Sequence, residues 1–176
     1  MITYRIMDVS MVSKLSEIDR SETIDTIFEM NEKQLSETEI HHECLNWNAD
    51  ELREIQERYV LELTAGGMAI GAFDKELLVG FGVLGHKLIG LNADQLQVDL
   101  MYVSQQYRKQ RIGTTILKMI SDEAKKRGAK YLYISSTETK GTVSFYMQNG
   151  GELADIPDET LYKKEPKDIH LIKKLD

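Results

Sequence analysis

The alternation of apolar and polar residues along the chain predicts strands mixed with helices. Apolar and aromatic residues occupy alternate positions between Ile2 and Met7, which predicts a strand. Apolar residues at intervals of three and four predict a helix that begins at Asn48 or Asp50 and ends at Gly66. The same two patterns predict further strands at Met68–Phe73, Leu77–Leu84, Gln95–Val103, Lys130–Ser135 and Ile169–Leu175, and further helices at Val9–Glu17, Ile112–Gly128 and Thr142–Gln148.

The segment from Asp19 to Trp47 is polar and acidic, and its pattern fits either extended structure or a partial helix. A strand–helix–strand unit runs from Gln95 to Ser135. This mixture predicts an α/β or α+β sandwich around a mostly antiparallel sheet. Only two prolines are present, both near the C-terminus, and no linker-like stretch interrupts the chain. Residues 1–176 are therefore expected to form a single domain.

Composition and charge exclude several classes of protein. The 176 residues are 41% hydrophobic and 29% charged, which is typical of a globular protein. The net charge of −7 disfavours nucleic-acid and membrane partners, since phosphates would be repelled. The first residues lack a signal-peptide pattern, and the lone Cys44 cannot form an internal disulfide. These features favour the cytoplasm.

A candidate anion site follows the strand that ends near Val103. A polar loop there runs into a helix whose start carries Arg108, Lys109, Arg111 and Gly113. The first amides of a helix have no internal acceptor, and the helix dipole adds partial positive charge. A phosphate could approach closely at Gly113 because glycine has no Cβ. The alternative is an ordinary helix start with a solvated basic face. The sequence contains neither a P-loop nor a dinucleotide-binding glycine motif.

This segment resembles the acetyl-CoA-binding motif of the GNAT acetyltransferases, whose core is Gln/Arg-x-x-Gly-x-Gly/Ala. Arg108 matches its first position and Gly113 its last. Downstream, Phe145-Tyr146-Met-Gln-Asn-Gly150 is similar to the family's Phe-Tyr-x-x-x-Gly. The resemblance implies a mixed, mostly antiparallel sheet of six to seven strands flanked by helices on both faces. Motif-level similarity covers Gln95 to Gly151, and the order of elements fits along the whole chain.

The chain departs from the family pattern at a few positions. Arg111 replaces the first motif glycine, although its amide remains able to bind phosphate. Gln105 stands where proline is common, and Gly151 where an aromatic often packs. Thr139 and Thr142 stand where the family often has Asn and Ala.

The resemblance implies acetyl-CoA as cosubstrate and no metal. The backbone of Met101 and Val103 would pair with the pantetheine arm, and the Val103 amide would polarise the thioester carbonyl. Amides from Arg108 to Thr114 would hold the pyrophosphate. The implied cofactor-binding residues are Met101, Tyr102, Val103, Arg108, Lys109, Gln110, Arg111, Ile112, Gly113, Thr114, Thr139 and Thr142.

Two residues are candidates for moving protons. An alkylamine with a pKa of ~10.4 must lose a proton before it attacks. Asp99 lies four residues before Val103, and a strand period of two would place it on the face of Met101 and Val103. It is a candidate base, with a role in binding a cationic acceptor as the alternative. Tyr146 matches the family's general acid, which protonates the leaving thiolate; packing against Phe145 is the alternative.

The expected activity is transfer of an acetyl group from acetyl-CoA to an amine by direct attack in a ternary complex. The early acidic residues favour a cationic acceptor, such as an aminoglycoside, a polyamine or a basic peptide; a solvated acidic face is the alternative. A non-catalytic acyl-CoA sensor would share the phosphate loop without needing Tyr146 or Asp99. His41-His42-Glu43-Cys44 lacks the spacing of a metal site. An exposed sheet edge would allow a homodimer.

Overall fold

A computed structural model describes residues 1–176 and places seven strands in one sheet and two in another. The order in the large sheet is β1-β4-β5-β6-β7-β9-β8, and only the β6–β7 pair is parallel. The predicted mixed, mostly antiparallel sheet is therefore confirmed. The strands are β1 (Ile2–Met7), β2 (Glu22–Asn31), β3 (Gln34–Cys44), β4 (Met68–Asp74), β5 (Leu77–Leu84), β6 (Gln95–Val103), β7 (Tyr131–Ser136), β8 (Gly151–Leu153) and β9 (Ile169–Lys174).

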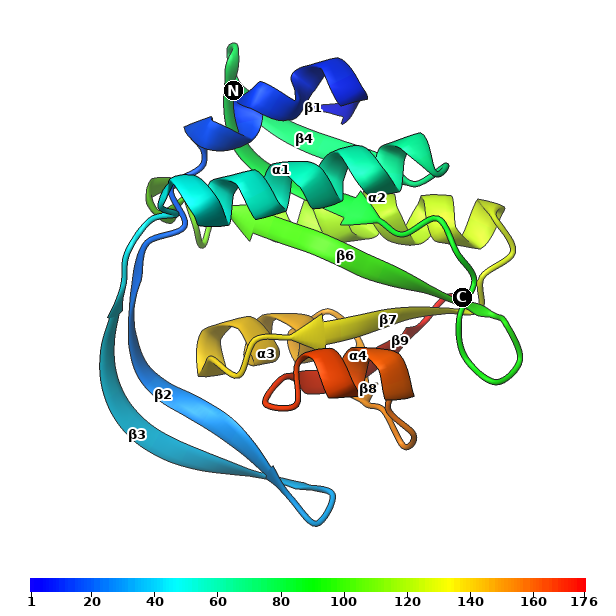
Figure 1. The fold of residues 1–176 in the computed structure, drawn as a ribbon. Helices are drawn as coiled ribbons and strands as arrows, with labels where there is room; N and C mark the ends of the chain where they lie inside the picture. The colour runs from blue at the N-terminus through cyan, green and yellow to red at the C-terminus, as the bar shows by residue number, and fades with distance from the viewer.

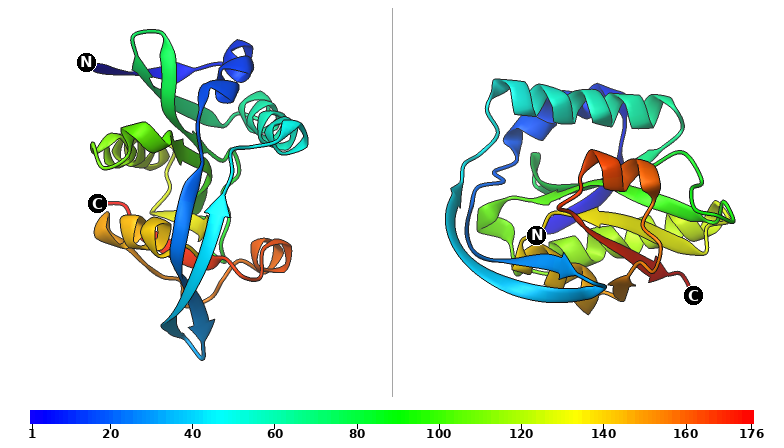
Figure 2. Two further views of the ribbon diagram at one scale, coloured as in Figure 1. Left: turned by 90° about the vertical axis from the view of Figure 1, so that its left-hand side faces the viewer. Right: turned by 60° about the horizontal axis from the view of Figure 1, so that its bottom comes forward.

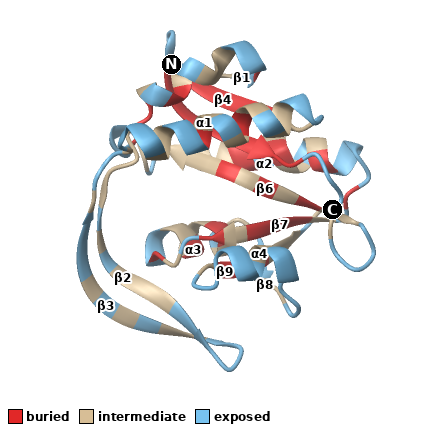
Figure 3. Ribbon diagram, in the orientation of Figure 1, coloured by how far each residue is buried: buried red, intermediate tan, exposed pale blue.

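Helices cover both faces of the large sheet, as expected (Figure 2). One face carries α2 and α3, and their apolar side chains form a core with β4 to β7 and β9. The other face carries α1 and η1, which bury a second core built around Tyr59, Phe73 and Phe81 (Figure 3). The helices are α1 (Ala49–Thr64), α2 (Ile112–Lys126), α3 (Lys140–Gln148), α4 (Glu159–Lys164) and the 3-10 turns η1 (Val9–Glu17) and η2 (Gln105–Tyr107).

The ambiguous segment after Asp19 is a long curved hairpin of β2 and β3 (Figure 1). It forms its own two-stranded sheet and reaches from the start of α1 to the region of α3. The Phe28 amide donates to the Glu138 carbonyl at 2.7 Å, and Lys140 pairs with Glu37 at 2.7 Å. The hairpin therefore contacts the start of α3 without joining the large sheet, and it is exposed or half-buried along its whole length (Figure 3).

The other predicted elements are confirmed with small changes of boundary. The predicted helix at Val9–Glu17 is a 3-10 helix, and Asp8 caps it by accepting from the Ser10 amide at 2.9 Å. Two elements were not predicted, namely the three-residue strand β8 and the single-turn helix α4. They lie in the connection from α3 to β9, which carries α4 to the face of the sheet that α1 covers (Figure 2).

Two glycines in β5 allow α2 to approach the sheet closely. A Cβ on Gly82 would lie 2.6 Å from Ile120 Cδ1, and one on Gly80 would lie 3.2 Å from Ile112 Cγ2. The pairing of β4 with β5 also shifts by one residue at Val79, between the Ala72–Gly80 and Phe73–Leu78 pairs. Close helix approach and a bulge therefore occur together in this strand.

We expect Gly82→Ala to lower the free energy of unfolding by about 1–3 kcal/mol, because the added methyl overpacks a closed core. Gly141→Ala is the matched control, since a Cβ there meets nothing within 4 Å. It should be neutral or stabilising by up to about 1 kcal/mol, because alanine is the better helix former. Urea unfolding of both variants measures the difference, and equal midpoints would contradict the packing argument.

None of the helices is both long and apolar enough to cross a membrane.

Candidate active site

The strands β6 and β7 meet at one end and then diverge, and this divergence defines the centre of the site (Figure 1). Their parallel pairing covers only Gln95–Gln97 against Tyr131–Tyr133. On its other side β6 stays paired with β5 as far as Val103. The second half of β6 therefore presents an edge with no neighbouring strand inside an otherwise continuous sheet.

The backbone of Met101 and Val103 faces this open edge. The Ser104 amide donates to the Val79 carbonyl at 2.9 Å, which makes Ser104–Val79 a hydrogen-bonded pair of the antiparallel ladder. Such pairs alternate with pairs whose amides and carbonyls point away from the partner strand. Val103 and Met101 occupy those alternate positions opposite Gly80 and Gly82. Both polar groups of Met101 and the Val103 amide are therefore available to an extended ligand that adds to the edge like a strand, whereas the Val103 carbonyl already accepts from Arg108 Nε at 3.0 Å.

A run of six free amides follows β6. The amides of residues 109–114 have no backbone acceptor, whereas Thr115 resumes helical bonding to the Arg111 carbonyl at 3.0 Å. Arg111 is the N-cap of α2 and its side chain makes no capping bond. Lys109 and Arg111 both have positive φ, of 61° and 65°. Alternating left-handed residues turn successive amides toward one concave side, which is a nest for an anion.

The left-handed backbone at Arg111 explains why a glycine is common at this motif position. This conformation costs a residue with a Cβ about 1–2 kcal/mol in free energy, whereas glycine adopts it freely. The chain thus retains the backbone geometry of the motif at a cost in stability, and gains a positive charge beside the nest.

Arg111→Gly is expected to be more stable than Arg111→Ala by about 1 kcal/mol, because only glycine relieves the strain. Both variants lose the same charge, so their difference isolates the backbone effect. Thermal unfolding of the two variants side by side tests this, and a more stable alanine variant would show that the residue does not hold a left-handed conformation.

Gly113 has a packing role in addition to the one expected. A Cβ on Gly113 would lie 3.2 Å from two ring atoms of Phe145 and 3.7 Å from the Met101 Cε. Its missing side chain therefore lets α2 and α3 pack together, in addition to leaving its amide in the nest. Ile112, between these two positions, is a buried core residue whose amide belongs to the same run.

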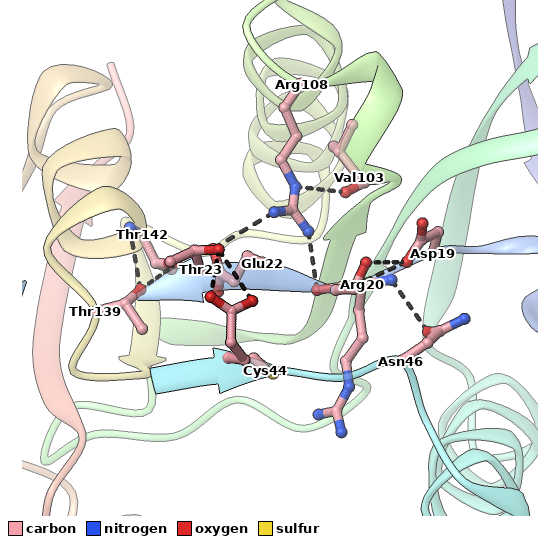
Figure 4. Close-up of polar contacts among 12 residues, drawn as sticks. Asp19, Arg20, Glu22, Thr23, Cys44, Asn46, Val103, Arg108, Thr139 and Thr142 are labelled. Carbon is pink, nitrogen blue, oxygen red and sulfur yellow. Dashed lines mark hydrogen bonds and ion pairs between the residues drawn. The ribbon is translucent and has the colours of Figure 1, made fainter. Parts of the chain in front are cut away.

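The Arg108 side chain points away from the nest and toward the β2–β3 hairpin (Figure 4). Its guanidinium donates to the Val103 carbonyl and the Arg20 carbonyl, both at 3.0 Å, and pairs with Glu22 at 3.4 Å. Its amide donates to the Gln105 carbonyl. The expectation that the Arg108 amide holds pyrophosphate therefore needs correction, because this donor is already used. The nest begins at Lys109.

The remaining expected cofactor-binding residues make polar or packing contacts within the protein. Gln110 bonds the Gln106 carbonyl at 3.1 Å through its amide side chain. Thr139 is the N-cap of α3, and it accepts from the Thr142 amide at 3.4 Å and donates to the Thr142 hydroxyl at 2.8 Å (Figure 4). Both threonines are therefore engaged in starting α3. Tyr102 projects to the opposite face, where its ring meets Trp47 edge-on at 4.9 Å.

Asp99 lies on the opposite face of β6 from the one expected. The β5–β6 register shifts between the Val83–Leu100 and Leu84–Val98 pairs, which makes Asp99 a bulged residue. A bulge interrupts the period of two, so the face assigned by counting from Val103 is wrong. Asp99 shares the α1 side of the sheet with Leu100 and Tyr102, whereas Met101 and Val103 face α2.

Arg58 of α1 holds the Asp99 carboxylate. One guanidinium nitrogen donates to Asp99 Oδ1 at 3.1 Å and to the Asp99 carbonyl at 2.9 Å. The other carboxylate oxygen is buried without a hydrogen-bond partner. Burial raises the pKa of Asp99, and the Arg58 charge only partly offsets this effect. A desolvated carboxylate with one unpartnered oxygen is suited to accept a proton or to bind an ammonium group.

Tyr146 lies in the second half of α3 with its side chain almost wholly buried. Burial, with a smaller contribution from nearby Tyr102, raises the pKa of the Tyr146 phenol well above its ordinary value. The phenol therefore keeps its proton throughout the physiological range. Its ring packs edge-on against Phe145 at 5.1 Å, so the two aromatic residues of the motif also form part of the core.

The structure adds two residues that the sequence interpretation missed. Arg58 comes from α1, and Asp168 precedes β9 and accepts from the Ser135 hydroxyl at 2.7 Å. Burial raises the pKa of Asp168 despite that hydrogen bond, and Arg58 acts on it electrostatically as it does on Asp99. No local motif marks either residue, because they reach the site from segments far apart in the sequence.

His41 and its neighbours lie along β3, where successive side chains point to opposite faces. His41 lies 3.5 Å from Asp25 and 3.8 Å from Glu43 on the exposed hairpin. The structure contains no group of three or more His, Cys, Asp or Glu side chains placed to hold a metal.

Comparisons with known proteins place the chain in a family. Residues 26–150 match the Acetyltransferase (GNAT) family, so this protein belongs to the GNAT acetyltransferases and is an acetyltransferase enzyme. No curated protein matches its sequence significantly.

Solved structures share the fold at low identity. A nourseothricin acetyltransferase superposes with a TM-score of 0.75 at 19% identity, over 99% of both chains. A putative streptothricin acetyltransferase from Bacillus anthracis in complex with acetyl coenzyme A gives 0.73 at 14%, over 100% of this chain and 99% of that one. PaiA N-acetyltransferase from Thermoplasma acidophilum, in complex with coenzyme A, gives 0.65 at 18%, over 99% of both chains.

Proposed function

We propose that this acetyltransferase moves an acetyl group from acetyl-CoA to a primary amine by direct attack in a ternary complex. The observation that carries the proposal is the run of free amides from Lys109 to Thr114, which follows the open edge of β6 after the 3-10 turn η2. CoA offers a pyrophosphate for such a nest and an amide-bearing pantetheine arm for such an edge. The structures of two similar proteins contain acetyl coenzyme A or coenzyme A.

The chemistry follows from the groups around the divergence of β6 and β7. The Val103 amide, which faces the open edge, would donate to the thioester oxygen as negative charge develops there. The amine would attack from the α1 side after losing a proton, and Asp99 is a desolvated carboxylate of β6 on that side. Collapse of the tetrahedral intermediate breaks the carbon–sulfur bond, and Tyr146 would give its proton to the departing thiolate.

A basic groove beside the nest supports CoA as the cosubstrate. It holds about 360 Å³ and begins at Thr114, the last residue of the free-amide run. Along α2 it continues past Lys118 and Lys125, and β9 contributes Lys173 and Lys174. Asp122, which pairs with Lys118 at 3.0 Å, and Asp176 offset only part of this charge. In a chain of net charge −7, a basic groove next to a phosphate nest suits a ligand with several phosphates.

The carboxylates of the hairpin and those near Arg58 support a cationic acceptor. The hairpin residues from Glu22 to Cys44 include one lysine and seven carboxylates, namely Glu22, Asp25, Glu29, Glu32, Glu37, Glu39 and Glu43. Asp99 and Asp168 add two partly desolvated carboxylates near Arg58. Aminoglycoside-like amines, polyamines and basic peptides share the charge that such a surface attracts. Two of the similar structures are a nourseothricin acetyltransferase and a putative streptothricin acetyltransferase, and those acceptors belong to those proteins.

Titration calorimetry with acetyl-CoA tests the proposal. We expect micromolar binding by the wild type and a loss of at least about tenfold in Thr114→Glu, whose carboxylate would repel the pyrophosphate. A glutamate in the first turn of a helix favours the helix itself, so this variant should fold. Thr160→Glu, in the first turn of α4, is the matched control and should bind normally.

Gly113→Glu would be a poorer probe, because its side chain would also strike Phe145. Folded wild-type protein that fails to bind acetyl-CoA would overturn the proposed activity.

A further inference from the structure

A hydrogen-bonded junction joins the β6–α2 loop to the first residues of the β2–β3 hairpin. Arg108 lies at its centre and contacts the Arg20 carbonyl, Glu22 and the Val103 carbonyl (Figure 4). Beside it, the Asp19 amide donates to the Ser104 hydroxyl at 3.0 Å, and the Gln105 amide donates to the Asp19 carbonyl at 2.9 Å. We call these residues the hairpin junction: Asp19, Arg20, Glu22, Ser104, Gln105 and Arg108.

The junction also reaches the segment that leaves the hairpin. The Arg20 amide donates to the Asn46 side chain at 3.1 Å (Figure 4). The Arg20 guanidinium pairs with Glu51 at 2.9 Å. The same guanidinium lies 5.7 Å from the centre of the Trp47 ring, which in turn packs on Tyr102. The chain before β2 and the chain after β3 are therefore anchored together, next to the loop that carries the free amides.

The contacts of Arg108 require a forked donor. Its three acceptors belong to two segments, β6 and the start of β2, that are more than 80 residues apart in sequence. A planar guanidinium can donate to several acceptors at once in fixed directions, whereas a lysine ammonium is a compact point charge on a flexible stem. Arg108 thus ties two segments together, and all of its recorded acceptors lie in these segments and not in the neighbouring nest.

We propose that Arg108 is a positioning residue that couples occupancy of the CoA nest to the order of the β2–β3 hairpin. The inference rests on the proposed binding of acetyl-CoA. The nest begins at Lys109, the residue after Arg108, so a pyrophosphate seated there restrains the loop that holds the hairpin junction. A restraint on one site lowers the entropic cost of ordering the other, and the coupling is reciprocal. CoA binding therefore prepares the acceptor side for the amine.

The hairpin is the part of the molecule best able to report this coupling. It belongs to its own two-stranded sheet and is largely exposed, so its amides should exchange through local opening. Hydrogen exchange followed by mass spectrometry, with and without CoA, compares residues 22–44 in the wild type and in Arg108→Lys. In the wild type, CoA should slow exchange in the hairpin about threefold or more. In Arg108→Lys, CoA affinity should change by less than about threefold while the hairpin response disappears.

A purely structural role for Arg108 would speed hairpin exchange equally with and without CoA, which would contradict the coupling. A loss of CoA affinity of more than about tenfold in Arg108→Lys would make the residue a phosphate ligand instead. No response of the hairpin to bound CoA in the wild type would also overturn the proposal, while leaving the acetyltransferase activity intact. Absence of CoA binding itself would instead refute the proposed cosubstrate.

Ser104→Ala tests the same junction without changing Arg108 or its charge. It removes the hydroxyl that accepts from the Asp19 amide and leaves the free amides unchanged. We expect a weaker CoA response in the hairpin at nearly wild-type CoA affinity. Trp47, the only tryptophan, gives a second readout, because its environment includes Arg20. Its fluorescence should respond to CoA in the wild type and less in both variants, and an unchanged response in both would contradict the proposal.

Discussion

Tyr146→Phe should lower kcat by about 10²–10⁴-fold while leaving acetyl-CoA affinity nearly unchanged. The departing thiolate needs a proton, and burial keeps the Tyr146 phenol protonated at every physiological pH. The substitution removes only the hydroxyl, so the ring packing against Phe145 and the core around Val143 is preserved. Steady-state kinetics together with calorimetry separate the loss of chemistry from loss of binding.

Tyr102→Phe is the matched control for this prediction. Tyr102 contributes electrostatically to the raised pKa of Tyr146. Its side chain packs on the core under α1, whereas Tyr146 belongs to the core under α2 and α3. Its hydroxyl has no assigned part in proton transfer, so kcat should fall by less than about threefold. If Tyr146→Phe is equally mild, Tyr146 is a packing residue. If the wild type binds CoA but acetylates no amine, a non-catalytic acyl-CoA sensor becomes the better explanation of its function.

The sequence predicted the large sheet and its helices because apolar residues mark their buried faces. β4 and β5 are buried on both faces and are nearly continuous apolar runs, whereas β6 and α2 carry their buried residues at strand and helix period. The β2–β3 hairpin lacks this signal because much of both its faces is accessible to solvent. The turn of the hairpin could not be recognised from the sequence either. Glu32 and Lys33 both have positive φ there, and asparagine or glycine usually occupies such positions.

The short elements near the C-terminus were missed for a different reason. β8 has three residues and α4 has six, which is too few to show a period. A local signal for α4 was nevertheless present. Pro157 precedes Asp158, whose side chain caps the helix by accepting from the Leu161 amide at 3.0 Å, and Lys163 and Lys164 lie in the last turn.

Within the site, the sequence could place backbone groups better than side chains. A motif that starts a helix determines where the free amides lie, whatever the side chains are. The direction of a side chain depends on register, and one bulge moved Asp99 to the face opposite Met101. The contacts of Arg108 and the approach of Arg58 depend on tertiary packing, which no local pattern encodes.

Asp99→Asn is the second substitution expected to have a large effect, and its kinetics should reveal the role of this carboxylate. If Asp99 is the base, kcat should fall by about 10²-fold or more, because the acceptor amine can no longer lose its proton to a positioned group. If Asp99 only holds a cationic acceptor, KM for the amine should rise while kcat is kept. The amide side chain has the same shape and can still accept a hydrogen bond from Arg58.

The pH dependence gives an independent check on the base. Asp99 must be ionised to accept a proton, and burial raises its pKa above the ordinary 3.8. Activity should therefore be present above this raised pKa and be lost as the pH falls through it, at a higher pH than for an exposed aspartate. This acidic limb in kcat/KM should vanish in Asp99→Asn.

Asp168→Asn provides the matched comparison, because it changes a second partly buried carboxylate near Arg58. Asp168 accepts a hydrogen bond from the Ser135 hydroxyl and lies next to the last residue of β7. It can attract a cation, but the proposed mechanism does not use it as a base. We expect a higher KM for cationic amines in this variant, with the acidic limb retained. An acidic limb that persists in Asp99→Asn and disappears in Asp168→Asn would transfer the role of base to Asp168 and reverse the two assignments.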